Sequence, residues 1–450
     1  MRFHVPAFLL VGMLLTANGA GQGVAVAPVA PTGGKINPPN TDFSAYEKKF
    51  PWVLSAAILQ AQAASMEKAK LHENVYEAKV GAYTLPDLFT LADGRKVSTP
   101  GGWEGERRAE LLEIFRREVY GISPPKPATL AFRLVASDPR ALQGEATLKR
   151  VAISFQLRNE TFQFHLSLFV PNRRSGPAPV FLLLNHRVAK NTDVTRQVRS
   201  EFWPAEYAVS RGYAIAAVDL DDEVDPDKPN ATTGLRAFYR RLYSKPEELT
   251  WATLASWAWS GSRAVDYFET DPDIDLARIA VIGHSRGGKT ALWAAAQDTR
   301  FALACVNCAG EGGPALSRRD FGETLGMITT NFPYWFTPTY ARYADRISSL
   351  PIDQHELVAL VAPRGYHGGD ASLDLHSDPR GSWLSLVQAT KVWALAGRAR
   401  VWPDSMPLVN DVVMDGPLAY HLREGGHALT TFDWKLYFDH ADLFFRRSPR

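Results

Sequence analysis

The feature that most constrains the fold is a serine held between two glycines, where an apolar run meets a helical pattern. Residues 279–289 read IAVIGHSRGGK, with Ser285 between Gly283 and Gly287. The apolar run predicts a buried strand, and residues 289–297 predict a helix. A G-x-S-x-G sequence in this strand–turn–helix setting is typical of a nucleophile elbow, in which small neighbours permit a strained turn. The alternative is a glycine-rich turn in an ordinary strand-to-helix connection. We predict that Ser285 is a catalytic nucleophile, with the helix N-terminus facing developing negative charge.

The elements around this elbow predict the fold class. Strands are predicted at 130–135, 149–157, 162–170, 180–184, 213–220, 279–282, 301–306 and 420–422, and helices at 103–120, 254–268, 289–297, 384–396 and 434–445. The first three strands have no helix between them, which favours antiparallel pairing at one edge. The later strands alternate with helices, which favours a parallel sheet covered on both faces. We predict an α/β-hydrolase fold, a three-layer sandwich with a mostly parallel central sheet and antiparallel N-terminal edge strands.

The N-terminal residues predict export. Arg2 and His4 precede an apolar run at 5–16, and small residues follow up to Ala20. This pattern is typical of a signal peptide over residues 1–20, and the run is too short to cross a bilayer. A buried helix is the alternative. We expect a secreted or periplasmic bacterial protein with no membrane span.

The rest of the chain is expected to form one catalytic domain. Residues 21–50 are rich in Gly, Pro and Ala and predict a flexible segment. Residues 51–450 are assigned to a single α/β-hydrolase domain, with an insertion around 311–356 where no strand is evident. We expect a monomer.

Charge and cysteine spacing argue against two classes of function. The net charge is +2 and no dense basic block is present, which argues against nucleic acid as a partner. The only two cysteines, Cys305 and Cys308, have the C-x-x-C spacing of redox motifs. They lie on one predicted strand, where the two positions are too far apart for a disulfide. We expect buried thiols.

A serine nucleophile needs a base, and in this fold the chain order is serine, acid, histidine. His427 lies in EGGHA, where two glycines suit a loop after the last strand. The other downstream histidines are His355, His367, His376, His421 and His440. His421 falls in a predicted strand and His440 in the closing helix. We predict that His427 is the base.

The acid is expected in the stretch GGDASLDLHSDPRGS, after the seventh strand of the fold. A carboxylate there would orient the imidazole and stabilise its charged form. Asp374 is central in this stretch. Asp370 is not excluded by spacing. Asp378 precedes Pro379 and is typical of a helix N-cap.

Five segments together resemble one known family. They are TWATLASWAWSGSRAVDYFET, GHSRGGKTALWAAAQD, GGPALSRRDFGET, NFPYWF and PIDQHELVALVAPR. They resemble the glucuronoyl esterases, carbohydrate esterase family 15, over most of the chain. Members cleave the ester between glucuronic acid side chains of xylan and lignin alcohols.

The resemblance implies roles for individual residues. Ser285 and His427 match the nucleophile and base, Arg286 an oxyanion contact, Lys289 a contact to uronate hydroxyls, and Glu323 a sugar-binding glutamate of bacterial members. Cations beside the serine suit an acidic sugar ester. A solvated helix residue is the alternative for Lys289.

The chain also departs from the family at three places. In the strand numbering of the family, fungal members carry the acid after the sixth strand, which corresponds to residues 301–306 here. This chain has Cys308 at that position, and Glu311 is the nearest substitute. Many bacterial members carry it after the seventh strand, which fits Asp374. A sugar-stacking tryptophan corresponds to His376. Residues 365–369, GYHGG, lack the apolar run of the family's strand.

The resemblance implies two-step acyl transfer on glucuronoxylan or lignin-carbohydrate esters, without a metal or cofactor. The oxyanion donors would be Arg286 and a group near residues 185–187. The alternatives are an acetylxylan or feruloyl esterase, a non-catalytic xylan-binding homologue, and a serine peptidase of the same fold.

Overall fold

The computed structural model describes residues 73–447. The predicted signal peptide (1–20) and flexible segment (21–50) lie outside the described residues. Among the described residues, no helix is long and apolar enough to cross a membrane.

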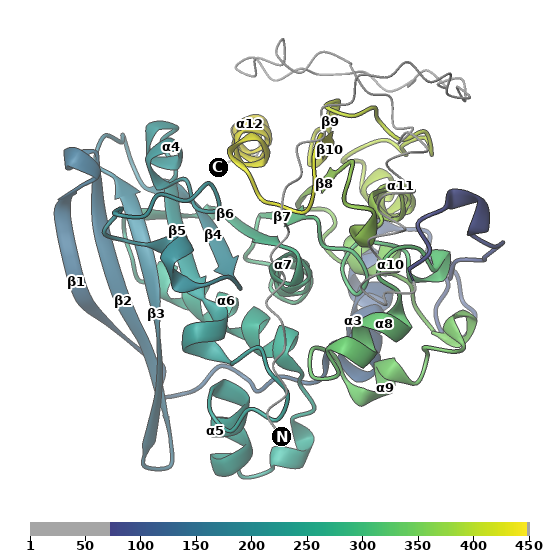
Figure 1. The fold of residues 1–450 in the computed structure, drawn as a ribbon, viewed down its shortest axis with the longest axis horizontal. Helices are drawn as coiled ribbons and strands as arrows, with labels where there is room; N and C mark the ends of the chain where they lie inside the picture. The colour runs from purple at the N-terminus through teal and green to yellow at the C-terminus, as the bar shows by residue number, and fades with distance from the viewer. Residues whose placement is uncertain (1–72, 448–450) are drawn as a thin grey trace, which may run out of the picture.

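One mixed sheet forms the centre of the molecule (Figure 1). Its strands are β1 (Ala131–Ala141), β2 (Ala146–Leu157), β3 (Glu160–Pro171), β4 (Ala178–Asn185), β5 (Ala214–Asp219), β6 (Ile274–His284), β7 (Leu303–Asn307), β8 (Gly365–Ala371), β9 (Val412–Asp415) and β10 (Leu418–Arg423). The order across the sheet is β1-β2-β3-β5-β4-β6-β7-β8-β10-β9.

The pairing confirms the predicted mostly parallel sheet. β1, β2, β3 and β5 pair antiparallel, whereas β5-β4-β6-β7-β8-β10 pair parallel. β9 adds an antiparallel strand at the other edge. Because the parallel strands share one direction, the loops after β6, β7, β8 and β10 leave the same edge of the sheet. In open parallel sheets this edge is where ligands bind.

Helices cover both faces of the sheet. They are α2 (Pro100–Gly102), α3 (Arg108–Phe115), α4 (Ala205–Ser210), α5 (Leu235–Leu242), α6 (Thr253–Phe268), α7 (Arg286–Gln297), α8 (Leu325–Asn331), α9 (Pro338–Ala341), α10 (Gln354–Ala359), α11 (Pro379–Leu395) and α12 (Thr431–Arg447). Single turns of wider π-helix at Trp103–Arg107 and Arg116–Tyr120 extend α3 in both directions. Gly121, with φ 87°, ends this helix.

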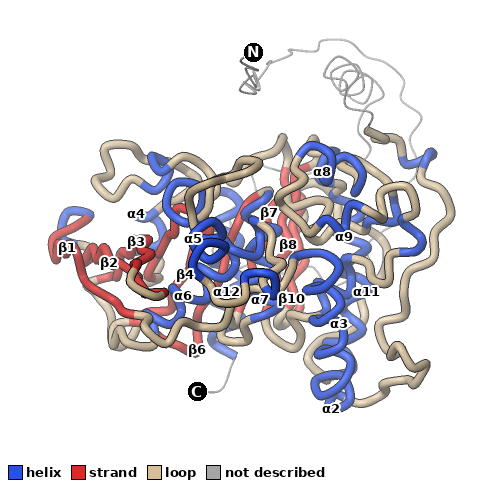
Figure 2. The backbone as a smooth tube through the Cα atoms, turned by 90° about the horizontal axis from the view of Figure 1, so that it is seen from below, coloured by secondary structure: helices blue, strands red, loops and turns tan. Residues whose placement is uncertain are grey.

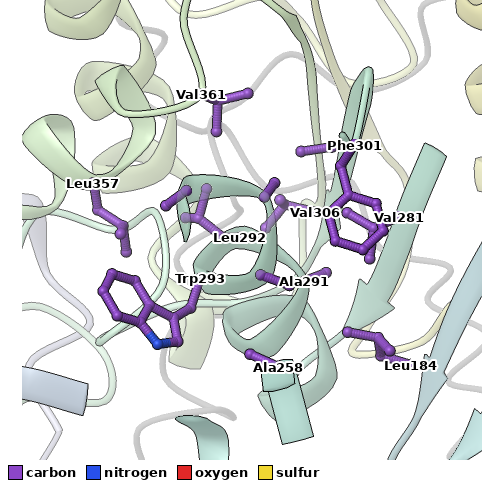
Figure 3. Packing of buried hydrophobic residues seen from close by; sticks show 14 of the residues in the cluster. Leu184, Ala258, Val281, Ala291, Leu292, Trp293, Phe301, Val306, Leu357 and Val361 are labelled. Carbon is purple, nitrogen blue, oxygen red and sulfur yellow. The ribbon is translucent and has the colours of Figure 1, made fainter. Parts of the chain in front are cut away.

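Two apolar layers fix the helices to the sheet. On one face, Phe181 of β4 packs on Trp434 and Phe438 of α12. On the other face, α7 lies in the larger core, where Leu292 and Trp293 are fully buried (Figure 3). Burial of side chains of this size stabilises a fold by about 1.5–3 kcal/mol each. The helix that begins after Ser285 is therefore held rigidly against the sheet.

One part of the chain differs from the simplest expectation, whereas residues 311–356 have no strand, as expected. Residues 365–369 lack an apolar run, yet they begin β8, which is buried between β7 and β10. Within 311–356 the structure has α8 and α9 and the start of α10, and no strand. These helices gather with α3 and α11 at the end of the molecule opposite β1 (Figure 2).

Candidate active site

Ser285 occupies a strained turn between β6 and α7. Its φ is 56° and its ψ is −129°, a conformation that side chains other than glycine rarely adopt. The backbone N–H of Ser285 donates to the carbonyl of Asn307 at 2.9 Å, which ties the turn to the end of β7. The N–H groups of Gly288 and Lys289 donate to the Ser285 carbonyl, whereas those of Arg286 and Gly287 precede the first hydrogen bonds of α7 and can face an anion.

The glycines around Ser285 are required by space. A Cβ on Gly283 would lie 1.9 Å from the carbonyl oxygen of Gly287. A Cβ on Gly287 would lie 2.8 Å from the carbonyl oxygen of Leu184. Both contacts involve backbone atoms that cannot move aside. The spacing therefore has the steric cause that the sequence suggested.

His427 is carried by the loop between β10 and α12, beside the elbow. Its ring lies 4.5 Å, centroid to centroid, from the ring of His284, which directly precedes Ser285. Among the described residues no hydrogen bond joins the Ser285 hydroxyl to His427. Such bonds are often long before substrate binds and tighten in the reacting complex.

Asp374 lies behind His427, in the loop after β8. Its Oδ2 is 2.7 Å from His427 Nδ1. Burial opposes the charge of Asp374, but the adjacent His427, its hydrogen bond and the Ser377 hydroxyl outweigh burial and lower the pKa of this carboxyl. Asp374 is therefore an anion that holds the proton of His427 on Nδ1 and leaves Nε2 free to accept one.

The other candidate acids have different partners. Asp370 lies within β8 and accepts from the Tyr420 hydroxyl at 3.0 Å. Glu311 accepts from Tyr340 and Ser317, and burial raises its pKa to about 8. Neither makes a hydrogen bond to His427 within residues 73–447. Asp378 caps α11 by accepting from Gly381 N at 2.9 Å, which confirms the predicted N-cap.

Cys308 occupies the position after β7. It is a free thiol, as is Cys305, and both are buried. Burial, with the nearby Asp374, raises the pKa of the Cys308 thiol well above its usual value, so it carries no charge. Its sulfur, the Asp374 carboxylate and the His427 ring offer ligand atoms within 4.8 Å of one another. This is the one group of three possible metal ligands among residues 73–447, and the Asp374–His427 bond already uses two of them.

Arg286 is held in place by groups that the sequence did not reveal. Its guanidinium forms an ion pair with Asp227 and lies 4.8 Å above the ring of Trp335. Trp335 Nε1 donates to the other Asp227 oxygen at 2.6 Å. Trp335 lies within NFPYWF, but Asp227 comes from a charged loop that is indistinguishable from a solvated one in sequence. The Asp227 carboxylate and the Trp335 ring therefore fix the guanidinium of the residue that follows Ser285.

A chain of charges runs beside the elbow. Lys289 Nζ lies 3.3 Å from Glu323, Glu323 lies 3.4 Å from His376 Nε2, and His376 Nδ1 lies 2.6 Å from Glu73. Burial opposes the charge of Glu323, but Lys289 and His376 lower its pKa to about 2. Burial likewise opposes the charge of His376, but Glu323 and Glu73 raise its pKa well above the usual value. Hydroxyl groups of a sugar could bind such alternating donors and acceptors.

The structure thus gathers the candidate residues from distant parts of the chain. Asp374 and His376 stand two residues apart on one loop, and the first faces His427 whereas the second faces Glu323. Ser285, Arg286 and Lys289 share the start of α7. Glu73 and Asp227 were missed, because lone acidic residues in loops carry no distinguishing pattern.

The chain is similar to several known esterases. A family model described as "Glucuronyl esterase, fungi" matches residues 153–397. A carbohydrate esterase from an unknown prokaryotic organism is 39% identical over 401 residues, covering 82% of this chain and 91% of that protein. A 4-O-methyl-glucuronoyl methylesterase from Schizophyllum commune is 29% identical, covering 69% of this chain and 74% of that protein. The solved glucuronoyl esterase from Solibacter usitatus has a TM-score of 0.76 at 36% identity, over 82% of this chain and all of that one.

Proposed function

The chain belongs to the glucuronoyl esterase family, carbohydrate esterase family 15, and on that premise we propose that it hydrolyses esters of glucuronic acid or 4-O-methyl-glucuronic acid. The natural substrate would be the ester between glucuronoxylan and lignin alcohols. The observation that carries the proposal is the strained Ser285 beside the hydrogen-bonded pair of His427 and Asp374.

The first half of the reaction would form an acyl-enzyme. His427 Nε2 takes the proton of the Ser285 hydroxyl as its oxygen attacks the ester carbonyl. The backbone N–H of Arg286, its side chain and a donor near residues 185–187 would stabilise the oxyanion. Loss of one such donor typically costs about 100- to 1,000-fold in rate. The C–O bond to the alcohol then breaks, and the alcohol leaves with the proton from His427.

The second half would release the acid. His427 takes a proton from water, which attacks the acyl carbonyl. The bond from that carbon to the Ser285 oxygen then breaks, His427 returns the proton to this oxygen, and the uronic acid leaves. The negative charge of Asp374 would stabilise the imidazolium that forms in each half. Lys289, Glu323 and His376 would bind the sugar hydroxyls and set its orientation.

The chain's departure from the family at His376 bears on specificity. A stacked tryptophan offers an apolar face to a sugar, whereas the imidazolium of His376 offers N–H donors. Acetylated xylan and a feruloyl ester are therefore compared with the uronate ester as substrates. Initial rates on methyl glucuronate, acetylated xylan and a feruloyl ester should show the highest kcat/KM for the uronate ester.

The same assay tests the nucleophile. Ser285→Ala should lower the rate on methyl glucuronate by at least about 10,000-fold with the fold intact. Saturable binding of xylan without any Ser285-dependent ester turnover would instead support a non-catalytic binding protein and contradict the proposal.

We also propose that the protein is exported, monomeric and built as one catalytic domain over residues 51–450. The pattern of residues 2–20 supports export. N-terminal sequencing of the mature protein and its mass in solution by light scattering test these points. Retention of residues 1–20 or a stable dimer would contradict them.

A further inference from the structure

One buried carboxylate lies behind both the nucleophile and the base. Asp433, in the first turn of α12, has no exposed surface. It accepts hydrogen bonds from Asn307 Nδ2 at 3.1 Å, Arg423 Nε at 3.0 Å, Thr430 N at 2.8 Å and Thr430 Oγ1 at 2.7 Å. His421 Nε2 lies 2.9 Å from it. These partners come from the ends of β7 and β10 and from the loop that carries His427.

The first branch runs from Asp433 to the nucleophile. A carboxylate only accepts hydrogen bonds, so it turns the amide NH2 of Asn307 toward itself and the amide oxygen away. That oxygen lies 2.7 Å from His284 Nδ1, which must therefore carry the ring proton. The backbone oxygen of the same Asn307 accepts from Ser285 N at 2.9 Å. Asp433 thus fixes Asn307. Asn307 in turn holds the elbow through two hydrogen bonds, one to the His284 ring and one to the Ser285 N–H.

The second branch runs from Asp433 to the base. Arg423 binds Asp433 through Nε and donates from Nη2 to the carbonyls of Gly426 and Ala428, at 2.7 and 2.6 Å. These two carbonyls flank His427 on either side in the chain. Thr430, at the end of the same loop, donates twice more to Asp433. The loop that carries the imidazole therefore depends on the position of this carboxylate.

We propose that Asp433 is a positioning residue that fixes Ser285 and His427 relative to each other, through Asn307 and His284 on one side and through Arg423 on the other. This inference rests on the proposed function. In this arrangement Asp433 is linked by hydrogen bonds to both His284 and the loop of His427, so it also fixes the packing of the two rings on each other. Reacting groups displaced by about 1 Å can lose roughly 100-fold in rate.

The alternative is that Asp433 only neutralises the buried Arg423. Breaking a buried ion pair is destabilising in itself. A purely structural role would lower the melting temperature and the amount of folded protein. It would leave kcat per folded molecule unchanged, which is the quantity to measure.

The test uses Asp433→Asn, which keeps the shape and removes the charge. Rates on methyl glucuronate are measured well below the melting temperature and divided by the folded fraction from circular dichroism. We expect kcat to fall about 30- to 100-fold, with KM within about twofold. Asp439→Asn is the matched control, because Asp439 lies on the same helix and pairs with Arg211 at 2.8 Å, away from the elbow. It should keep kcat within about twofold.

Arg423→Lys gives a second arm if Asp433→Asn folds poorly. It retains a cation beside Asp433 but cannot reproduce the fork that holds both Gly426 and Ala428. We expect kcat to fall about tenfold with KM unchanged. A wild-type kcat per folded molecule in either folded variant would contradict the positioning role of Asp433.

Ser285→Ala separates this inference from its premise. If Ser285→Ala is inactive while folded Asp433→Asn has a normal kcat, only the positioning role of Asp433 is wrong. If Ser285→Ala retains uronate ester hydrolysis, the proposed function is wrong, and the positioning role of Asp433 is wrong with it.

Discussion

The loops after β7 and β8 leave the same edge of the sheet, yet they offer His427 very different groups. The β7 loop presents Cys308, a buried and uncharged thiol. The β8 loop presents Asp374, an anion bonded to the imidazole at 2.7 Å. Both groups lie within 4.8 Å of His427 and of each other.

An acid that orients the imidazole must lie beside the imidazole, but it need not come from one fixed place in the chain. Neighbouring parallel strands end about 4.8 Å apart, so a carboxylate from either strand end reaches the same ring. A chain that lacks the acid after β7 can therefore retain the chemistry through β8. Variants of these two loops test whether the charge of the acid, or the strand end that carries it, decides activity.

Removal of the β8 charge should have the largest effect. We expect Asp374→Asn to lower kcat about 1,000- to 10,000-fold, because the amide cannot stabilise the imidazolium or enforce its tautomer. Steady-state rates on methyl glucuronate measure this, with thermal unfolding as the check on folding. Near-normal turnover would show that another group orients His427.

Return of a carboxylate to the β7 side should partly restore the Asp374→Asn variant. Cys308→Glu in that background places an acid within reach of the same ring, and we expect at least about tenfold recovery of kcat. Cys308→Gln in the same background is the control of equal size without charge. Equal rates for the two double variants would contradict the view that either strand end can serve.

The two groups should also act at opposite ends of the pH scale. The pKa of Asp374 is lowered, so its contribution to stability is present above the unfolded value of about 4 and is lost as the pH falls. The pKa of Cys308 is raised, so the folded state keeps its proton and stability is lost as the pH rises above about 8.5. Each group contributes a slope of up to about 1.4 kcal/mol per pH unit in its window.

The free energy of unfolding, measured as a function of pH, tests the direction of each effect. Asp374→Asn should flatten the loss of stability in acid, and Cys308→Ser should flatten the loss in alkali. If Cys308→Ser alters the acid side instead, the thiol does not have the environment described here.

The smallest effect is expected from Glu311, the other acid on the β7 side. Its carboxyl is bonded to Tyr340 and Ser317, and burial raises its pKa to about 8, so it is largely uncharged at neutral pH. Glu311→Gln should leave kcat within about threefold, measured on the same ester. A loss comparable with that of Asp374→Asn would reverse the comparison between the two loops.

The sequence was sufficient to predict the elements with strong local patterns. The apolar strands and the elbow were found because the strand, the glycines and the helix lie next to one another in the chain. β8 was not predicted from GYHGGDA, because its pairing with β7 and β10 decides its conformation. A Cβ on Gly369 would lie 2.4 Å from both the His421 ring and the Tyr437 hydroxyl, so packing requires glycine in this strand.

The candidate site divides in the same way. Ser285, Arg286 and Lys289 follow from one motif. Asp227 and Glu73 instead contact residues far away in the chain, and Asp433 reaches the end of β7 through the distant Asn307. Spacing left Asp370 open beside Asp374, because the direction of each side chain depends on where β8 ends. Asp370 is still within the strand, and Asp374 is in the loop beyond it.

The most direct test of the account is to identify the acylated residue during turnover. The enzyme would be mixed with methyl glucuronate, quenched in acid within the first turnovers and digested, and its peptides examined by mass spectrometry. The account predicts a glucuronoyl adduct on the peptide that contains Ser285, and none in Ser285→Ala. Rapid turnover with no adduct on Ser285, or with an adduct on another residue, would contradict it.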